Sequence, residues 1–288
     1  MPRPELRRLV LALALLEDLD LTPGPADVRL GADPPVVLTW EHVAEAIGGL
    51  DPDSASARTR LAAHVRLIRT TSRLAPDRLF ARIRPVGLPV DHILHPGPDW
   101  VCQRVRGGVL DLGLGLAVDA VVDPGSSYEW AFGAKASGSP VEILPPALLV
   151  QLGGSRPQWW PTARDRLERM GALAIELLVS TPPGRRRDVL TEVGQTDVVT
   201  LLGSGAYRGG LAGADGSGMR AAVVPMRNRG WVDLRGIDPV FAPAAASAVE
   251  PEDRGFDRPL LITYEEVALA RPYRRAQRRR GPRLLPDG

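Results

Sequence analysis

The feature that most limits the fold is an alternating stretch in the middle of the chain, Trp100 to Leu116, with Gly107-Gly108 near its centre. Alternation of apolar and polar residues has the period of a half-buried β-strand, and two glycines between such runs are typical of a tight hairpin turn. The spacing predicts that Val105 lies opposite Leu110 in this hairpin. A pairing shifted by one residue would exchange the two faces, so the register is well specified.

The two faces of the predicted hairpin differ in kind. The apolar face holds Val101, Val105, Leu110, Leu112, Leu114 and Leu116, together with Gln103. The opposite face holds Cys102, Arg104, Arg106, Asp111, Gly113 and Gly115. The two glycines leave room for another element or a ligand to approach the strand closely, and we favour close packing by a neighbouring helix.

Helical and strand periodicities along the rest of the chain predict an α+β protein. Residues 1–75 are expected to form a small helical unit, with helices at 4–19, 40–47 and 54–70 and a short strand at 27–30. Residues 76–270 are expected to form an α+β domain with a mixed sheet and packed helices. Its further predicted elements are strands at 197–202 and 220–226, a helix capped by Thr162, and a helix at 263–270.

The end of the chain is strongly basic. Residues 271–288 carry seven arginines and one acid, a net charge of +6, which leaves 29 basic and 33 acidic side chains, or −4, for the other 270 residues. We predict a disordered tail that can hold nucleic acid electrostatically. The acidic body does not favour a broad nucleic-acid-binding face. Lysine occurs once in the chain, so arginine is its default cation and is weak evidence of function by itself.

The sequence favours a cytoplasmic protein without a membrane span. Its one cysteine, Cys102, excludes an intramolecular disulfide, which fits a reducing compartment. The apolar run Leu9 to Leu16 follows three arginines, but acidic residues come directly after it. That run is also shorter than the roughly 20 residues that a spanning helix needs, so we expect a core helix there.

A glycine-rich segment is the first candidate site. The predicted strand 197–202 leads into Gly203-Ser204-Gly205, and Gly209 follows, with the spacing G-x-G-x-x-x-G. A strand, a glycine turn and a helix start together present backbone N–H groups that bind phosphate. The spacing differs by one residue from the dinucleotide fingerprint, and the Gly-Lys-Ser/Thr of a Walker A motif is missing. An ordinary turn is the competing interpretation.

Residues 39–70 are the second candidate, because a capped helix followed by a glycine turn and another helix resembles a helix-turn-helix. The second helix would read DNA and would present Arg58, Arg66 and Arg69 along one flank. The connection between the helices is longer than the roughly three to four residues that are usual for this motif. Plain helical packing is therefore the alternative.

The histidines give weaker signals. Asp91, His92, His95 and Cys102 are residue types that bind zinc, but the H-x-x-H pair has no second strong pair to complete a site. Hydrogen-bonded or solvated histidines are the alternative, and we assign no metal. His64 lies beside the apolar stripe of its helix, where we expect one hydrogen bond to satisfy it. His42 and Glu45 share a helix face but have no partner that the sequence identifies.

No local motif specifies a reaction, since G-x-S-x-G, H-E-x-x-H, C-x-x-C and the kinase signature are missing from the sequence. We expect an interaction or regulatory protein. A phosphate- or nucleotide-binding enzyme using Gly203–Gly210 is second, and a DNA-binding regulator using residues 39–70 is third. The sequence specifies no cofactor, and it leaves open a protein partner or nucleic acid bound by the tail.

Several segments resemble an uncharacterised protein family of GC-rich bacteria. They are Leu38–Gly48, Arg104–Leu116, Asp197–Ser204, Val224–Arg227 and Ile237–Pro239. The resemblance spans most of the chain. It implies no activity, cofactor or site residue, so the candidate sites rest on the residues alone.

Overall fold

The computed structural model describes residues 4–16, 19–31, 35–72, 75–105, 112–119, 141–151, 154–181, 188–232 and 240–269. The protein is an α+β protein, as its periodicities predict, and its described strands form three sheets. Every strand pairing between the named strands is antiparallel, whereas the sequence suggested a mixed sheet. Among the described residues, no helix is long and apolar enough to cross a membrane.

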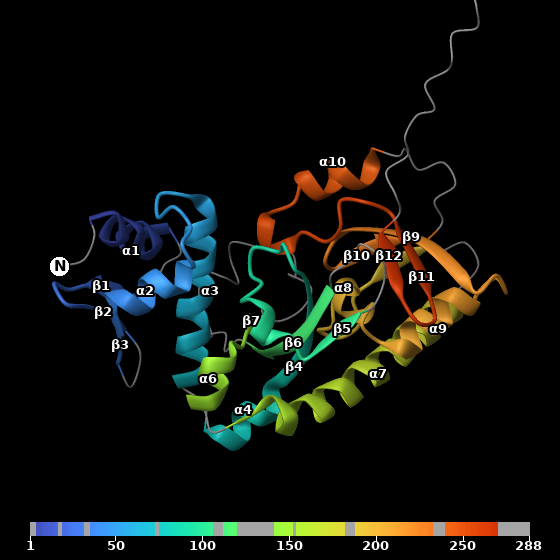
Figure 1. Ribbon diagram of the computed structural model, residues 1–288, viewed down its shortest axis with the longest axis horizontal. Helices are drawn as coiled ribbons and strands as arrows, with labels where there is room; N and C mark the ends of the chain where they lie inside the picture. Colours follow the sequence, from blue (N-terminus) through green and yellow to red (C-terminus); the bar gives the residue numbers. More distant parts are fainter. Residues whose placement is uncertain are drawn as a thin grey trace, which may run out of the picture.

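The N-terminal part combines helices with a small sheet, at one end of the molecule (Figure 1). Its elements are α1 (Pro4–Leu16), β1 (Leu21–Pro23), β2 (Asp27–Leu30), β3 (Val36–Thr39), α2 (Trp40–Ile47) and α3 (Ala55–Ser72). The expected helices and the strand at 27–30 are present, and β1 and β3 add a sheet that the sequence did not predict. Helix α2 begins at the predicted cap, because the Thr39 side chain accepts a hydrogen bond from the His42 N–H, and it ends at Gly48 in the left-handed region.

The central part is built around a strand that is buried on both faces. Its elements are α4 (Pro76–Arg82), β4 (Ile83–Pro89), the 3₁₀ turn η1 (Pro98–Trp100), β5 (Gln103–Val105), β6 (Leu112–Asp119), β7 (Val141–Ile143), α6 (Pro146–Gln151) and α7 (Arg156–Ser180). The sheet order is β4-β6-β5, and β7 also pairs with β6. Residues of β6 enter three different core clusters, so this strand joins the central layers.

The C-terminal part forms a five-stranded sheet in the order β12-β11-β9-β10-β8. Its elements are β8 (Val189–Thr191), α8 (Val198–Leu201), α9 (Gly205–Gly213), β9 (Met219–Met226), β10 (Arg229–Trp231), α10 (Phe241–Ser247), the 3₁₀ turn η2 (Pro251–Asp253), β11 (Leu260–Thr263) and β12 (Val267–Leu269). Helix α7 runs along this part and packs on α9 (Figure 1).

The predicted hairpin is present with a longer connection. Val105 pairs with Leu112 instead of Leu110, so the register is displaced by two residues. Because side chains alternate with a period of two, this displacement keeps the assignment of faces. Leu112 and Leu114 are fully buried, and Arg104 is exposed. Residues 106–111, which hold the predicted turn, lie outside the described residues.

Three predicted elements differ from the structure. Residues 197–202 form helix α8 instead of a strand, because the Asp197 side chain accepts a hydrogen bond from the Thr200 N–H at 2.6 Å and caps a helical turn. Residues 263–270 do not form a helix, since their described part belongs to the hairpin of β11 and β12. Helix α7 begins at Arg156 with Ser155 as its cap position, so the predicted start at Thr162 was wrong.

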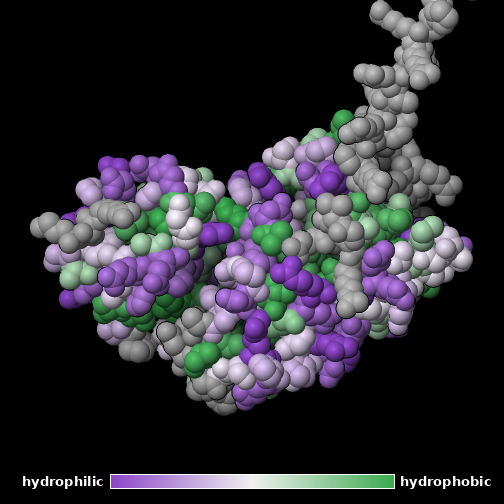
Figure 2. Space-filling view, in the orientation of Figure 1, coloured by the Kyte–Doolittle hydropathy of each residue, from purple (hydrophilic) through white to green (hydrophobic). Residues whose placement is uncertain are grey.

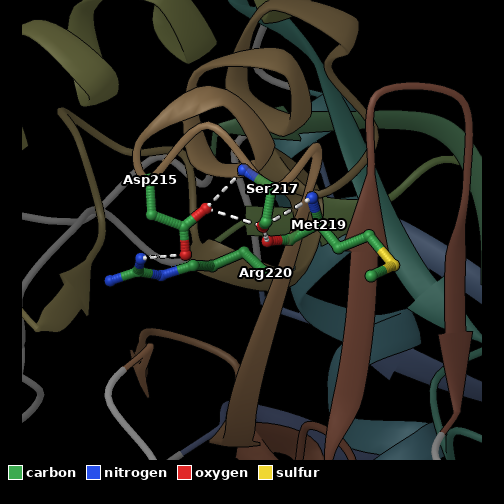
Figure 3. A network of polar contacts seen from close by, with 4 residues as sticks. All are labelled: Asp215, Ser217, Met219 and Arg220. Atoms are coloured by element: carbon green, nitrogen blue, oxygen red, sulfur yellow. Dashed lines mark hydrogen bonds and ion pairs between the residues drawn. The ribbon is translucent and has the colours of Figure 1, made fainter.

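Polar contacts hold the turn between α9 and β9 (Figure 3). The Asp215 carboxylate accepts hydrogen bonds from the Ser217 N–H at 3.0 Å and the Ser217 hydroxyl at 2.6 Å. It also accepts one from Arg220 at 3.2 Å. These bonds lower the pKa of Asp215, with those from Ser217 as the largest cause. Asp215 is exposed, so we assign the network to the turn and not to a site.

Candidate functional site

The glycine-rich segment joins two helices. Gly203 and Ser204 connect α8 to α9, and Ser204 caps α9 by accepting a hydrogen bond from the Tyr207 N–H at 3.2 Å. Ser204 is fully buried beneath α7, where a side chain at Gly171 would strike its hydroxyl oxygen at 2.1 Å. The segment therefore packs closely against α7, which explains the glycine at position 171 opposite Ser204.

The start of α9 already holds an anion from within the chain. The Glu168 carboxylate of α7 accepts hydrogen bonds from the N–H groups of Gly205 at 3.1 Å and Ala206 at 3.0 Å. It also accepts one from the Ser204 hydroxyl at 2.8 Å. Partial burial would raise the pKa of Glu168, but these hydrogen bonds outweigh it, and the pKa is lowered. The carboxylate thus interacts favourably with the positive end of the helix dipole.

Gly203 and Gly205 do line a cavity, of about 860 Å³, whose other walls carry charged side chains. These are Arg164, Glu168, Arg208, Glu265 and Glu266. A phosphate at the start of α9 would have to displace Glu168, and it would also meet two further carboxylates. The geometry therefore favours a structural role for Gly203, Ser204, Gly205 and Gly209 over the predicted phosphate site.

Replacing Glu168 by alanine tests this role. We expect Glu168→Ala to lower the free energy of unfolding by about 2 kcal/mol, because the buried Ser204 hydroxyl and two helix N–H groups lose their acceptor. Urea unfolding followed by circular dichroism measures the change. Glu176→Ala on the exposed side of α7 is the matched control and should stay within about 0.5 kcal/mol of the wild type. Equal losses in the two variants would contradict the assignment.

The second helix of the predicted helix-turn-helix is a central packing element. After Ala55, no residue of α3 is exposed, because the helix lies between the N-terminal core and the central sheet. Arg66 forms an ion pair with the buried Glu142 of β7 at 3.4 Å. A helix whose residues after Ala55 are all buried or half-buried cannot enter a DNA groove without being uncovered. The geometry does not favour Arg58, Arg66 and Arg69 as a DNA-reading set.

The loop with the predicted metal ligands is held by protein contacts. His92 is buried, its Nδ1 accepts a hydrogen bond from the Leu94 N–H, and its Nε2 lies 3.2 Å from the Glu252 carbonyl oxygen. His95 is also buried, and its Nδ1 accepts a hydrogen bond from the Gly97 N–H. Within the described ranges, no group of three His, Cys, Asp or Glu residues is arranged to hold a metal ion. Asp91, His92, His95 and Cys102 therefore receive no support as a zinc site.

Cys102 is half-buried, and its thiol is poorly suited to reaction. Burial raises the pKa of Cys102 to about 11, in spite of the nearby positive charge of Arg156. A thiol with so high a pKa is almost fully protonated at neutral pH, and the thiolate is the nucleophile.

The basic tail, residues 271–288, lies outside the described residues.

The structure brings together histidines that are far apart in the sequence. His42 of α2, His64 of α3 and His95 of the loop before η1 line one cavity of about 320 Å³, and they are three of the four histidines in the chain. Its other polar walls are Glu45 and Arg60, and its apolar walls are Ala46, Ala63, Leu67, Leu94, Pro96, Ile143 and Pro145. We call it the histidine cavity. A few convergent polar groups in a mostly apolar lining are typical of small-molecule sites.

The polar groups of the histidine cavity differ in exposure and charge. His42 and Glu45 are exposed, whereas His95 and Leu67 are buried, so the cavity extends inward from α2. Burial lowers the pKa of His64, the neighbouring His42 lowers it further, and Glu45 acts in the opposite direction. His64 is therefore a neutral imidazole at physiological pH, able both to donate and to accept a hydrogen bond.

Neither a surface pattern nor a sequence relative identifies the site. Hydrophilic residues cover most of the face seen in Figure 2, and apolar residues form small patches between them. No family model matches the chain, and neither a curated protein nor a solved structure is significantly similar to it. The histidine cavity is thus chosen on its geometry alone.

Proposed function

We propose that this is a non-enzymatic regulatory protein that responds to a small molecule bound in the histidine cavity. One observation carries the proposal: three histidines from three separate segments line a single cavity with a glutamate and an arginine. Cavities of roughly 300–1,000 Å³ bind small ligands, and about 320 Å³ suits a compact one. We also propose a soluble, cytoplasmic location, which the single cysteine supports.

The wall of the cavity supports a regulatory role, because it also contacts the C-terminal part. We call residues 90–97 the bridging loop. Arg60 Nε of α3 donates a hydrogen bond to the Ile93 carbonyl oxygen at 2.6 Å on one side of this loop. On the other side, His92 Nε2 donates to the Glu252 carbonyl oxygen of η2 at 3.2 Å. A ligand that moves the loop would therefore change contacts on both sides.

The bridging loop also separates two cavities. Its residues 94–96 line the histidine cavity, and its residues 90–93 line a second cavity of about 640 Å³ beside Arg254 and Phe256. Two cavities with a shared wall can be coupled energetically, since any shift that favours one arrangement of the wall changes both. This arrangement supports a protein that reports ligand binding at a distance.

The proposal is tested by filling the cavity. Ala63 of α3 lines it, and Ala63→Leu should occupy part of the space without removing a polar group. We expect at least one compound from a set of small carboxylates, amides and amines to raise the Tm of the wild type by several degrees, since ligand at about 100 times its Kd adds about 2.7 kcal/mol. The rise should be lost in Ala63→Leu.

The matched control is Ala55→Leu, at the exposed start of the same helix, which should keep the full rise in Tm. Hydrogen exchange then distinguishes a regulator, in which the ligand changes distant contacts, from a protein that only holds the ligand. Ligand should slow amide exchange in the bridging loop and also at Arg227, whose N–H donates to the Asp253 carbonyl oxygen of η2. A rise in Tm that persists in Ala63→Leu, or no rise with any compound, would refute the proposal.

A further inference from the structure

The polar groups of the histidine cavity come as two pairs on neighbouring helices. His42 and Glu45 are three residues apart on α2, and Arg60 and His64 are four residues apart on α3. Residues at these spacings lie on the same helix face, so each pair faces the cavity together. The cavity is therefore lined by nitrogen-bearing side chains on both helices and by a single carboxylate.

Arg60 is fixed in place by the backbone around it. Its Nε donates to the Ile93 carbonyl oxygen at 2.6 Å. Its Nη1 lies 2.6 Å from the point where a Cβ of Gly48 would be, so the guanidinium passes over the glycine that ends α2. Gly48 lies in the left-handed region with φ of 60°, where a residue without a side chain is favoured. A preorganised guanidinium loses little entropy when it binds an anion.

His95 contributes a ring wall to the cavity. Its Nδ1 accepts from the Gly97 N–H, and its Nε2 lies 3.2 Å from the point where a Cβ of Gly113 would be, on the side of β6. The ring also packs edge-on against Trp100, with centroids 5.3 Å apart. Leu67, Leu94 and Ile143 also line the cavity, so His95 and these residues give it an aromatic and apolar portion.

We propose that the histidine cavity binds a compact carboxylate with an apolar body, and that binding is coupled to proton uptake by His64. This inference rests on the proposed function, and it adds the ligand class. The carboxylate would accept hydrogen bonds from Arg60 and from the imidazoles of His42 and His64. The body would lie against Leu67 and Leu94.

The coupling follows from charge. The opposite charges of Arg60 and Glu45 offset each other, and the neutral imidazole of His64 adds no charge. The remaining lining segments, β7 and the loop before α6, contribute only Ile143 and Pro145, which do not titrate. A bound anion stabilises the protonated form of the His64 imidazole, so up to one proton is taken up when it binds. Affinity should then rise up to about tenfold for each pH unit of acidification toward pH 6.

Benzoate is a suitable probe, with benzamide as its neutral isostere and acetate as the acid without an apolar body. Isothermal titration at about pH 6 and about pH 8, in two buffers that differ in ionisation heat, gives both the affinity and the number of protons taken up. We expect benzoate to bind at least about tenfold more tightly than either comparison compound at the lower pH. Proton uptake should be between about 0.5 and 1 per benzoate bound.

Two variants assign the interaction. Arg60→Gln should lower the affinity for benzoate at least about tenfold. His64→Asn should also lower this affinity and remove most of the proton uptake. His64→Asn leaves the contact between Arg60 and Ile93 in place, so it remains informative where Arg60→Gln loosens the bridging loop. The matched control is Arg58→Gln, which lies on the same helix outside the lining and should bind benzoate as the wild type does.

The outcomes separate the ligand class from the proposed function. Benzamide binding as tightly as benzoate, without proton uptake and with sensitivity to Ala63→Leu, would overturn the carboxylate assignment while the cavity remained a ligand site. Benzoate binding that is unchanged in both His64→Asn and Ala63→Leu would place benzoate outside the histidine cavity, and it would also overturn the carboxylate assignment. A failure of every compound to bind would refute both.

Discussion

Replacing Trp100 by alanine is expected to lower the free energy of unfolding by about 4 kcal/mol, because large-to-small changes of a buried aromatic residue typically cost about 3–5 kcal/mol. The indole is almost fully buried, and its Nε1 donates a hydrogen bond to the Leu116 carbonyl oxygen at 3.0 Å. Its ring lies over Gly115, at 2.2 Å from the point where a Cβ would be. The substitution therefore opens a cavity against β6 and removes one of two hydrogen bonds that the Leu116 carbonyl oxygen accepts, the other being donated by the Leu144 N–H at 3.0 Å.

A double-mutant cycle makes this prediction specific to the fit between Trp100 and Gly115. Gly115→Val alone should also destabilise the protein, since the new side chain would overlap the indole ring. In the Trp100→Ala background the same valine enters the space left by the ring. The double variant should therefore be more stable than the sum of the two single effects predicts, by about 1–3 kcal/mol, in urea unfolding curves. Additive effects would show that the two residues do not pack as described.

The glycines of β6 illustrate how far the sequence leads. Alternation correctly predicted which residues of 112–116 share a face, and it predicted close packing against Gly113 and Gly115. The neighbour of Gly115 is the Trp100 side chain, and the neighbours of Gly113 are the Val101 and His95 side chains, so no α-helix packs there. Periodicity identifies a position that needs a small residue, but the partner depends on how the chain returns over the strand, which the local pattern does not contain.

Residues 197–202 show where local propensity fails. Val198, Val199 and Thr200 are β-branched and favour a strand, and the structure makes them a helical turn because Asp197 caps it. The side chain of Arg227, in the turn after β9, pairs with Asp197 and supports the cap. A contact between residues 30 positions apart thus stabilises the local structure, and the local sequence pattern does not contain that contact.

The histidine cavity was missed for a similar reason. His42 with Glu45 was recognised as a pair without a partner, and His64 was interpreted as a core-edge residue. The structure places them in one cavity because α2 and α3 pack against each other and the bridging loop closes beside them. Three of the four histidines in the chain line this cavity, and only the tertiary arrangement brings them together.

Acidification is expected to destabilise the protein through His92, with a contribution of up to about 5 kcal/mol. Burial, and then the positive charge of Arg227, lower the pKa of His92 to about 3 from 6.5, although the hydrogen bond to the Glu252 carbonyl opposes the shift. The unfolded chain therefore binds a proton between about pH 6.5 and about pH 3 that the folded protein does not bind. The contribution of His92 is complete above pH 6.5 and is lost as the pH falls toward 3, by about 1.4 kcal/mol per pH unit.

Glu142 opposes this trend. Burial is the largest cause that raises the pKa of Glu142 to about 7 from 4.5, and the ion pair with Arg66 reduces the shift. The folded protein binds a proton there that the unfolded chain lacks between those two values. The contribution of Glu142 is complete below pH 4.5 and is lost as the pH rises through about 7. The two contributions nearly cancel between about pH 6.5 and pH 4.5, and below pH 4.5 only the loss from His92 remains.

The cancellation makes single variants diagnostic. Glu142→Gln should remove the opposing contribution, so that the effect of His92 on the pH dependence of unfolding is seen alone. The free energy of unfolding of this variant, relative to the wild type, should fall on acidification from about pH 7 to about pH 4.5. His92→Gln should show the opposite trend, gaining relative to the wild type as the pH falls from about 6.5 toward 3. Urea unfolding at several pH values measures both, and the slopes are independent of any constant loss from the substitutions themselves. Parallel curves for wild type and His92→Gln would mean that His92 titrates normally and is not held neutral between Leu94 and Glu252.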